Sequence, residues 1–364
     1  MAKIKQKFDF LDSFDKEIEK MEGVSTEGSP PRYWHSFGNH TINRVMSGSF
    51  YKGIPQGRIT ALCGPSHAGK SFLAGNLCRQ AQEDGAYVLV IDSENALDNE
   101  FMQRIGVDTR PEAGYKYTSP TTIPQTVKIV SNFINKYKAE VGMSVDAPPV
   151  LIVVDSLDGC QTPAEYEAAA KGEIQFDRGQ KPKMQKSMLM GWIPDIKSLN
   201  ISIVVTKQVY RASQEQILQG EGSWVVNDAI RFPCSQILLA TKLKLKDKTT
   251  KAVTGIKMKV ESFKSRFTLN NVSVIEVPWD APMSPYSGCF DIALTLGVIK
   301  QSGAWYTIPG DEKKYRRDDI ESNKMEEIIK LCEQAGGGSV DSFALISDEY
   351  DEVTGVKPAN WSEE

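Results

Sequence analysis

Short uninterrupted apolar runs recur along the middle of the chain, and longer amphipathic stretches separate them. Runs over 59–63, 86–91, 150–155 and 201–206 are rich in Val, Ile and Leu, as buried parallel strands are. Similar runs over 235–241, 256–261 and 272–277 predict further strands. Between them, the periodicity predicts helices over 123–138, near 183–199 and directly after the first strand. This alternation, from about residue 33 to 282, predicts a mostly parallel α/β sheet flanked by helices.

The two ends of the chain do not share this alternation. Leu11, Phe14, Ile18 and Met21 recur at three- and four-residue spacing, which predicts an amphipathic helix over 8–21. A linker rich in Gly, Ser and Pro follows at 23–31, and the helix either folds back onto its own core or docks on a neighbouring protomer. We therefore predict four parts: helix and linker 1–31, core 32–282, a small C-terminal domain 283–340 and a tail 341–364.

Two polar segments interrupt the core. Residues 159–182 combine charged and apolar residues with several glycines. Residues 209–224 are polar and contain Gly220 and Gly222. Both patterns predict loops, and the first loop is expected to have little fixed structure.

The composition is that of an ordinary soluble globular protein, with 40% hydrophobic and 25% charged residues among 364. No apolar stretch approaches a membrane span in length, and the N-terminus lacks the apolar core of a signal peptide. The six cysteines are scattered without a CxxC pair, and the three histidines form no metal-binding pattern. We therefore expect a cytoplasmic protein without a membrane partner, whose cysteines are small buried residues.

The net charge of −4 argues at face value against a nucleic-acid partner, but the charge is unevenly distributed. Residues 341–364 contain seven acidic residues and one lysine, so this tail carries −6 and the rest of the chain carries +2. The tail is either a solvated solubility segment or an acidic flap that competes with phosphates for a basic groove.

The segment after the first predicted strand, Gly64-Pro-Ser-His-Ala-Gly-Lys70-Ser71, matches the pattern GxxxxGK[ST]. It lies between a strand and a helix, the context that distinguishes a phosphate-binding loop from an ordinary glycine turn. Loop N–H groups and the helix N-terminus would bind the phosphates of a nucleoside triphosphate, Lys70 would reach the β- and γ-phosphates, and Ser71 would ligate Mg²⁺. The expected nucleotide-binding residues here are Gly64, Pro65, Ser66, His67, Ala68, Gly69, Lys70, Ser71 and Phe72.

Three polar residues follow the ends of other strands. Asp155 closes a buried strand and is expected to hold Mg²⁺ or its water shell, the alternative being an N-cap of the next helix. Glu94 lies just past the strand 86–91 and is expected to act as general base toward a water aligned on the γ-phosphate, unless it is a surface turn acid. Gln208 follows the strand ending at Thr206, where an amide can sense the γ-phosphate and signal to the next loop.

Several motifs occur in a characteristic order: the loop 64–71, Ile91-Asp-Ser-Glu-Asn-Ala-Leu-Asp98, Val153-Val-Asp-Ser156 and Gly303-Ala-Trp-Tyr306. Together they resemble RecA-family recombinases. The segments Val260-Glu-Ser-Phe-Lys-Ser-Arg266 and 285–297 favour the phage UvsX type. The resemblance covers about residues 36–307 and implies a RecA-like P-loop ATPase core with an N-terminal helical arm and a small C-terminal domain.

The resemblance implies roles for individual residues of the ATP site. Glu94 matches the catalytic glutamate, and Asp155 with Ser156 matches the second Walker motif. Asp98 and Phe101 match positions that contact adenine.

Three further residues match positions that respond to the nucleotide. Gln208 matches the γ-phosphate-sensing position. Lys264 and Arg266 match paired basic residues that reach the ATP of the adjacent protomer, where cations stabilise developing phosphoryl charge. An exposed basic strand end is the alternative for this pair. The expected catalytic set is thus Lys70, Glu94, Gln208, Lys264 and Arg266.

The segments 159–182 and 209–224 resemble the two DNA-binding loops of the family. The matching DNA-contact positions are Lys183, Lys186, Tyr210, Arg211, Gly222, Ser223 and Trp224. Cations and N–H groups would bind phosphates, and an aromatic ring would stack on bases without reading them. Taken singly, Trp224 also fits a half-buried core position, and the first loop contains acids as well as bases.

The resemblance implies an ATP-dependent DNA strand-exchange recombinase that forms a helical filament on single-stranded DNA and tests it against duplex DNA. It would be a DNA-dependent ATPase that hydrolyses ATP to ADP or further, with Mg²⁺ as cofactor. A single-strand-binding protein and a recombination mediator are the implied partners, in recombination, repair and recombination-dependent replication, within the host cytoplasm if the chain is phage-encoded. Two alternatives stay open: a ring helicase, although only about thirty residues precede the core, and a non-catalytic ATP-gated coating protein, which Glu94 disfavours.

Overall fold

The computed structural model describes residues 14, 16–18, 30–142, 144, 146–175, 179–214, 223–246, 253–269, 271–278 and 283–335. The chain divides into two compact units, Met1–Arg32 and Tyr33–Glu364. In the first unit, Phe14 and residues 16–18 are helical, in agreement with the predicted helix over 8–21, whose other positions lie outside the described residues. The tail 341–364 lies outside them as well.

Among the described residues, eight strands of the second unit form one sheet. Each strand from β10 to β5 runs parallel to its neighbour, and β11 and β12 are added in antiparallel fashion at one edge. In sheet order the strands are β12 (Val272–Pro278), β11 (Val253–Ser265), β10 (Gln236–Lys246), β3 (Ile59–Gly64), β7 (Ile201–Gln208), β6 (Val150–Asp155), β4 (Tyr87–Asp92) and β5 (Tyr115–Thr118). The predicted mostly parallel sheet is confirmed.

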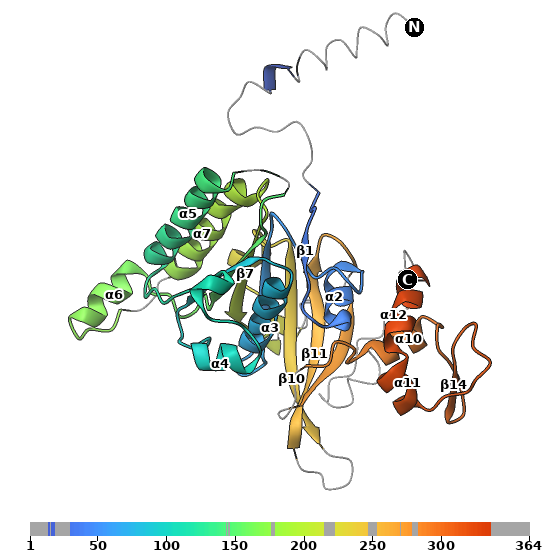
Figure 1. Cartoon of the computed structure of the whole chain (residues 1–364). Coiled ribbons are helices and arrows are strands. Elements are labelled where there is room, and N and C mark those ends of the chain that lie inside the picture. The colour runs from blue at the N-terminus through green and yellow to red at the C-terminus, as the bar shows by residue number, and fades with distance from the viewer. Residues whose placement is uncertain are drawn as a thin grey trace, which may run out of the picture. The chain divides into compact units, whose positions relative to one another are not determined.

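Helices cover both faces of this sheet, because successive strand side chains point to opposite sides (Figure 1). Val154 of β6 packs in a core with α5 (Ile123–Glu140), α7 (Gln180–Ile196) and α9 (Asp228–Arg231). Its neighbour Val153 packs in a second core with α2 (His40–Ser47), α3 (Lys70–Glu83) and α4 (Asn99–Arg104). Burial on both faces explains why these strands read as continuous apolar runs.

The elements from α10 to α12 pack around a third hydrophobic cluster. The Glu333 carboxylate links α12 to the segment after α2, accepting hydrogen bonds from Ser49 Oγ at 2.6 Å and Phe50 N at 2.9 Å. The predicted domain boundary at 283 stays a prediction. The remaining elements are β1 (Trp34–His35), β2 (Ile54–Pro55), the 3₁₀ helix η1 (Pro111–Ala113), α6 (Pro163–Ala170), β8 (Tyr210–Arg211), β9 (Trp224–Val225), α10 (Cys289–Thr295), β13 (Lys300–Ser302), β14 (Trp305–Thr307), α11 (Arg317–Asn323) and α12 (Met325–Ala335).

The prediction of a loop with little fixed structure over 159–182 is wrong. Helix α6 forms within it because Thr162 and Glu165 make a capping box and Pro163 occupies the first turn, where its missing N–H costs nothing. The next helix, α7, begins at Gln180 rather than at Lys183. The segment 209–224 is also not loop throughout, because Tyr210 pairs with Val225 across β8 and β9; residues 215–222 lie outside the described ones.

Strands β10 and β11 extend well past the predicted 235–241 and 256–261. They pair with each other out to Lys246 and Val253, although β3 pairs with β10 only as far as Leu239. All six cysteines are buried and unpaired, as expected. None of the described helices is long and apolar enough to cross a membrane.

Candidate functional site

The carboxyl ends of four adjacent strands meet at one edge of the sheet. Gly64, which ends β3, lies beside Gln208 at the end of β7, and Asp92 of β4 lies beside Asp155 of β6. Ligands bind at this edge in open α/β sheets. The structure therefore brings together the predicted phosphate loop, Asp155, Gln208 and the segment that carries Glu94.

Both ends of the loop from Gly64 to Gly69 require glycine. A Cβ at Gly64 would lie 2.4 Å from the carbonyl oxygen of Ala240, so only glycine fits. Gly69, at the start of α3, has φ 93°, and His67 also has a positive φ of 59°. Because Gly69 has no side chain, it does not cap α3, and the first N–H groups of the helix can serve an anion.

The Lys70 ammonium folds over this loop. Its Nζ donates hydrogen bonds to the carbonyl oxygens of Gly64, at 3.1 Å, and Pro65, at 2.9 Å. Burial lowers the pKa of Lys70 below its ordinary value. Three carboxylates oppose that shift, from Asp155, Glu94 and Asp158. Lys70 is thus a cation surrounded by acids, at the position where a triphosphate would replace the loop carbonyls as its partner.

Asp155 provides the clearest sign of a metal site. The residue is 2% exposed; one carboxylate oxygen accepts a hydrogen bond from the Thr206 hydroxyl, and Oδ2 has no hydrogen-bond partner among the described residues. Burial raises the pKa of Asp155, and the nearby Thr206 and Ser71 hydroxyls partly oppose the shift. A buried carboxylate oxygen without a partner near a hydroxyl suits Mg²⁺, which prefers hard oxygen ligands and keeps several waters or phosphate oxygens. The described residues contain no cluster of three or more His, Cys, Asp or Glu side chains that could bind a metal on its own.

Glu94 is exposed at the same edge, and the Ser156 hydroxyl donates a hydrogen bond to its Oε1. A second serine tightens this junction: Ser93 Oγ donates to the Ser156 carbonyl at 2.7 Å and accepts from Ser156 N at 3.1 Å. The peptide bond between Asp155 and Ser156 is cis. The second Walker motif and the Glu94 segment are therefore held together by direct hydrogen bonds.

Asp92 is a residue of this site to which the sequence analysis assigned no role. It is fully buried, and its carboxylate accepts hydrogen bonds from the backbone N–H groups of Glu94 at 3.1 Å, Ala96 at 3.1 Å and Leu97 at 2.8 Å. Asp92 thereby shapes the turn that presents Glu94. An aspartate ending an apolar run and followed by serine was the available signal for such a turn.

The predicted adenine-contact residues lie at the end of this turn. Asp98 caps α4 by accepting a hydrogen bond from Phe101 N at 2.8 Å, and the Phe101 ring packs partly buried against the second core. The two residues are therefore neighbours, and the cap fixes the orientation of α4.

Lys264 and Arg266 are not brought to this edge. The strand register sets Lys264 level with Ile237 and hence with Ala61, three residues before Gly64. That corresponds to about 10 Å along the strands, at about 3.3 Å per residue. The Lys264 ammonium instead donates to the carbonyl oxygens of Arg231 and, at 2.7 Å, Cys234. It lines a surface pocket of about 450 Å³ formed by Asp228, Arg231, Phe232, Phe263 and Lys264.

The predicted DNA-contact residues occupy α7 and the β8–β9 hairpin. Lys183 and Lys186 are exposed on α7, and Lys186 Nζ lies 4.7 Å from the ring centre of Phe232. Tyr210 is 68% exposed, whereas Trp224 is partly buried against the first core, with the Arg211 guanidinium 5.7 Å from its ring centre. Ser223 is exposed, and Gly222 lies outside the described residues.

Comparison with known proteins agrees with this arrangement. A model of the RecA N-terminal domain matches residues 35–270 of the chain. The chain belongs to the RecA family. It is 26% identical to Protein RecA of Thermus aquaticus over 285 residues, which cover 78% of each chain. It is 24% identical to Protein RecA of Frankia casuarinae over 289 residues, covering 76% of this chain and 78% of that one. Against Protein RecA of Nautilia profundicola the identity is 26% over 259 residues, covering 70% and 68%.

Membership of the RecA family carries the general activity of its members, which are DNA-dependent ATPases that act in recombination and repair and use ATP with Mg²⁺. The RecA assignment made from the motifs is therefore confirmed. The narrower assignment to the phage UvsX type stays a prediction.

Proposed function

We propose that this chain is an ATP-dependent strand-exchange recombinase that polymerises as a helical filament on single-stranded DNA. The observation that carries the proposal is the distance between two groups of expected catalytic residues within one protomer. The phosphate loop, Asp155 and Glu94 lie at one edge, and Lys264 lies about 10 Å back along the strands, bonded to carbonyls of its own protomer.

We assign the roles within one protomer from the site geometry together with the family resemblance. Residues 64–72 hold the phosphates, and Lys70 exchanges its carbonyl partners for phosphate oxygens. Ser71 and Asp155 Oδ2 would hold Mg²⁺, which would supply positive charge to the phosphates. Glu94, held by Ser156, accepts a proton from the attacking water. Asp98 and Phe101 flank the base, and Gln208 responds to the γ-phosphate.

The cations Lys264 and Arg266 act on the ATP of the adjacent protomer. Their own phosphate loop is out of reach along the sheet, so they contribute to hydrolysis only if a neighbour presents its nucleotide to them. Burial lowers the pKa of Lys264, and the nearby Arg266 charge lowers it further, so an anion brought to this pair would be favoured. Hydrolysis then depends on assembly, which is what a filament enzyme requires.

DNA binds along α7 and the segment 209–224. Lys183 and Lys186 on α7, and Arg211 in β8, supply charge for the phosphates. Tyr210, with its largely exposed ring, is the better stacking residue, and Trp224 with Arg211 anchors the hairpin. Ser223 and Gly222 would offer backbone N–H groups. This binding is independent of base sequence, so duplex DNA is tested by base pairing with the bound strand.

The remaining assignments belong to the same proposal. We place the chain in the phage UvsX branch, in the host cytoplasm, with roles in recombination-dependent replication as well as recombination and repair. A single-strand-binding protein and a loading mediator are the expected partners. Residues 1–31 would contact the neighbouring protomer, and 283–340 would form a separate small domain before the acidic tail.

The decisive test combines electron microscopy with an exchange assay. We expect the purified protein to form helical filaments on single-stranded DNA with a non-hydrolysable ATP analogue, to release DNA with ADP, and to pair the strand with homologous duplex. If the protein remains monomeric and does not bind the single-stranded oligonucleotide, with or without nucleotide, the proposal is falsified. Closed rings that unwind a fork would identify a helicase instead.

A further inference from the structure

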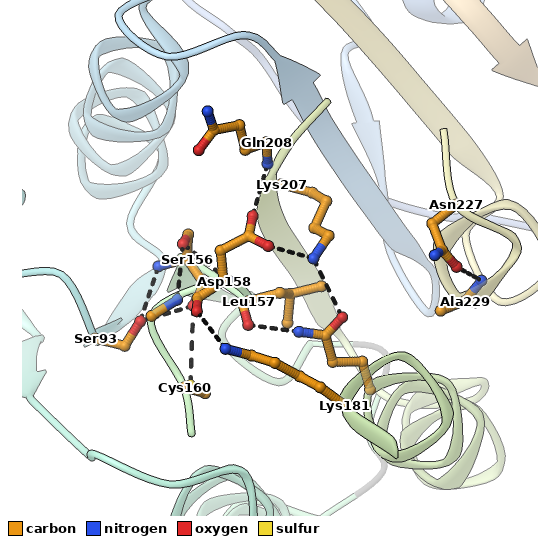
Figure 2. Close-up of polar contacts among 12 residues, drawn as sticks. Ser93, Ser156, Leu157, Asp158, Cys160, Lys181, Lys207, Gln208, Asn227 and Ala229 are labelled. Atoms are coloured by element: carbon orange, nitrogen blue, oxygen red, sulfur yellow. Dashed lines mark hydrogen bonds and ion pairs between the residues drawn. The ribbon is translucent and has the colours of Figure 1, made fainter. Parts of the chain in front are cut away.

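The turn that follows β6 joins the ATP site to two other elements of the chain (Figure 2). The Ser156 hydroxyl, which donates to Glu94, also accepts hydrogen bonds from the N–H groups of Asp158 at 3.1 Å and Gly159 at 3.3 Å. A Cβ at Gly159 would lie 2.3 Å from Ser93 Oγ and 2.9 Å from Glu94 Cγ. The turn therefore presses directly against the segment that carries the proposed general base.

Asp158 extends from this turn to the end of β7. Its Oδ1 forms an ion pair with the Lys207 ammonium, and its Oδ2 accepts a hydrogen bond from Gln208 N at 2.8 Å. The Lys207 and Asp158 side chains are only 15% and 28% exposed, the most sheltered ion pair among the described residues. Such a pair is screened less by water than an exposed one. The Asp158 carboxylate thus contacts both Lys207 and Gln208, the last two residues of β7. Gln208 is the residue proposed to sense the γ-phosphate.

Helix α7 is fastened to the same turn. Lys181 Nζ donates to the Asp158 carbonyl at 2.8 Å, and the buried Gln185 donates to the Leu157 carbonyl at 2.6 Å. Gln185 also accepts a hydrogen bond from Lys207 Nζ at 3.3 Å. Figure 2 shows Lys181 reaching the turn from α7 and Lys207 reaching it from β7. The same helix carries the exposed Lys183 and Lys186.

We propose that Asp158 is a positioning residue that couples the nucleotide site to DNA binding, by fixing Gln208 and α7 to the turn that supports Glu94. The inference rests on the proposed function and deepens it. Any shift of Gln208 toward or away from a γ-phosphate moves the backbone N–H that Asp158 binds. Because the turn, Lys207 and Gln185 are hydrogen-bonded in one network, that shift reaches α7 without passing through solvent.

The network predicts a ranking of variants. Asp158→Ala removes the ion pair and the Gln208 bond together, Asp158→Asn keeps an acceptor for Gln208 N but loses the charge, and Lys207→Met removes only the ammonium. The Asp158→Ala variant should therefore be affected most, and Asp158→Asn should recover part of the loss. The double variant Asp158→Ala with Lys207→Met should be only slightly worse than Asp158→Ala alone, because beyond the ion pair it loses only the 3.3 Å hydrogen bond from Lys207 to Gln185.

The experiment measures coupling rather than activity alone. For each full-length variant, the dissociation constant of a fluorescent oligo-dT is measured with a non-hydrolysable ATP analogue and with ADP, and KM and kcat are measured with DNA. We expect the ratio of the ADP to the ATP-analogue dissociation constant to fall about tenfold in Asp158→Ala, the effect of roughly one hydrogen bond to a charged group. kcat should fall by a larger factor than KM for ATP changes, because no residue of the phosphate loop is replaced and Asp158 is only one of three carboxylates near Lys70.

A matched control is the ion pair between Lys138 and Asp195, at 2.8 Å, which also joins α7 to another element and is 35% and 41% exposed. Lys138→Met should keep the wild-type ratio. Melting temperature and binding of a fluorescent ATP analogue report whether each variant is folded. The inference is overturned if Asp158→Ala and Asp158→Asn both keep the wild-type ratio of the ADP to the ATP-analogue dissociation constant for oligo-dT. It is also overturned if Lys138→Met lowers that ratio as much as Asp158→Ala does. Either result leaves the proposed function standing. If the wild-type protein itself binds DNA equally with ATP and ADP, both fail.

Discussion

The hydroxyl of Ser156 donates a hydrogen bond to the carboxylate of Glu94, so a residue next to the proposed metal ligand holds the proposed general base. Glu94 otherwise lies exposed on a turn, and an exposed carboxylate has many rotamers available. The bond selects one of them before substrate arrives. Preorganisation of this kind lowers the cost of aligning a base with water in the transition state.

Glu94→Gln should reduce ATP hydrolysis by about 100-fold or more, the usual contribution of a positioned general base, while ATP binding is retained. The glutamine keeps the hydrogen bond from Ser156 but cannot accept the proton. Steady-state hydrolysis with single-stranded DNA and equilibrium binding of a fluorescent ATP analogue separate the two effects. Glu112→Gln, at an exposed glutamate in η1, is the control and should hydrolyse ATP normally. Unchanged turnover in Glu94→Gln would remove Glu94 from the mechanism.

Asp155→Asn should stabilise the nucleotide-free protein and abolish its response to Mg²⁺–ATP. The native carboxylate is buried with one oxygen unpartnered, and burial raises its pKa, so the folded state disfavours the charged form relative to the unfolded chain. Stability is therefore lost as the pH rises through the raised pKa, and a neutral amide avoids that loss, which we put at about 1 kcal/mol.

Thermal melting with and without Mg²⁺–ATP checks this prediction. The wild type should gain melting temperature on adding Mg²⁺–ATP, and Asp155→Asn should start higher and gain little. Asp195→Asn, at a partly exposed carboxylate on α7, should keep the wild-type gain. If Asp155→Asn melts at a lower temperature than wild type without nucleotide, the prediction is wrong. The charged Asp155 would then stabilise the folded protein through its neighbours.

The parts of the fold that follow from local chemistry were predictable from the sequence. Buried parallel strands such as β6 need apolar side chains on both faces, and the loop at Gly64 needs glycine because a carbonyl approaches it, so both are visible as residue types. The capping box of Thr162 and Glu165 was visible too, but the glycines and charges around it favoured a loop. Weighing the cap would have predicted α6.

The polar contacts that organise the site were not predictable in the same way. Asp92 and Asp158 act by accepting backbone N–H groups, and every residue type except proline supplies one. Which amide reaches which carboxylate depends on turns that form only after the sheet has paired. The position of Lys264 relative to its own phosphate loop likewise follows from the register of three strands, which no local pattern specifies.

His35 should make the folded protein less stable in mild acid. The ring is fully buried in β1, and burial lowers the pKa of His35 to about 4 from an ordinary value of 6.5. Between these pH values the unfolded chain binds more protons than the folded one, so the free energy of unfolding falls as the pH drops from about 6.5 toward 4. We expect about 2 kcal/mol of loss between pH 7 and pH 5 from this residue, at 1.36 kcal/mol per pKa unit.

Urea unfolding at pH 7 and pH 5 measures that loss. His35→Phe replaces the imidazole by a ring that does not titrate, so its free energy of unfolding should change between the two pH values by about 2 kcal/mol less than that of the wild type. Trp34→Phe, at the neighbouring position of β1, replaces one ring that does not titrate by another; it is the control and should keep the wild-type pH dependence. An equal pH dependence in wild type and His35→Phe would show that His35 is not the acid-sensitive group.

Mixing two inactive variants should restore ATP hydrolysis if Lys264 acts across the protomer boundary. Lys264→Ala keeps an intact phosphate loop. Lys70→Arg keeps an intact Lys264, but its bulkier guanidinium does not place the positive charge on the phosphates as Lys70 does. In a filament of the two variants mixed at random in equal amounts, about a quarter of the interfaces would be functional. Each of these pairs the unaltered phosphate loop of a Lys264→Ala protomer with the unaltered Lys264 of a Lys70→Arg protomer. We therefore expect DNA-stimulated hydrolysis to rise well above that of either variant alone. Lys257→Ala, on the same strand and ion-paired to Glu276 at 2.9 Å, should be active by itself. No recovery on mixing, with both variants present in the filaments, would place Lys264 in the chemistry of its own protomer or outside it altogether.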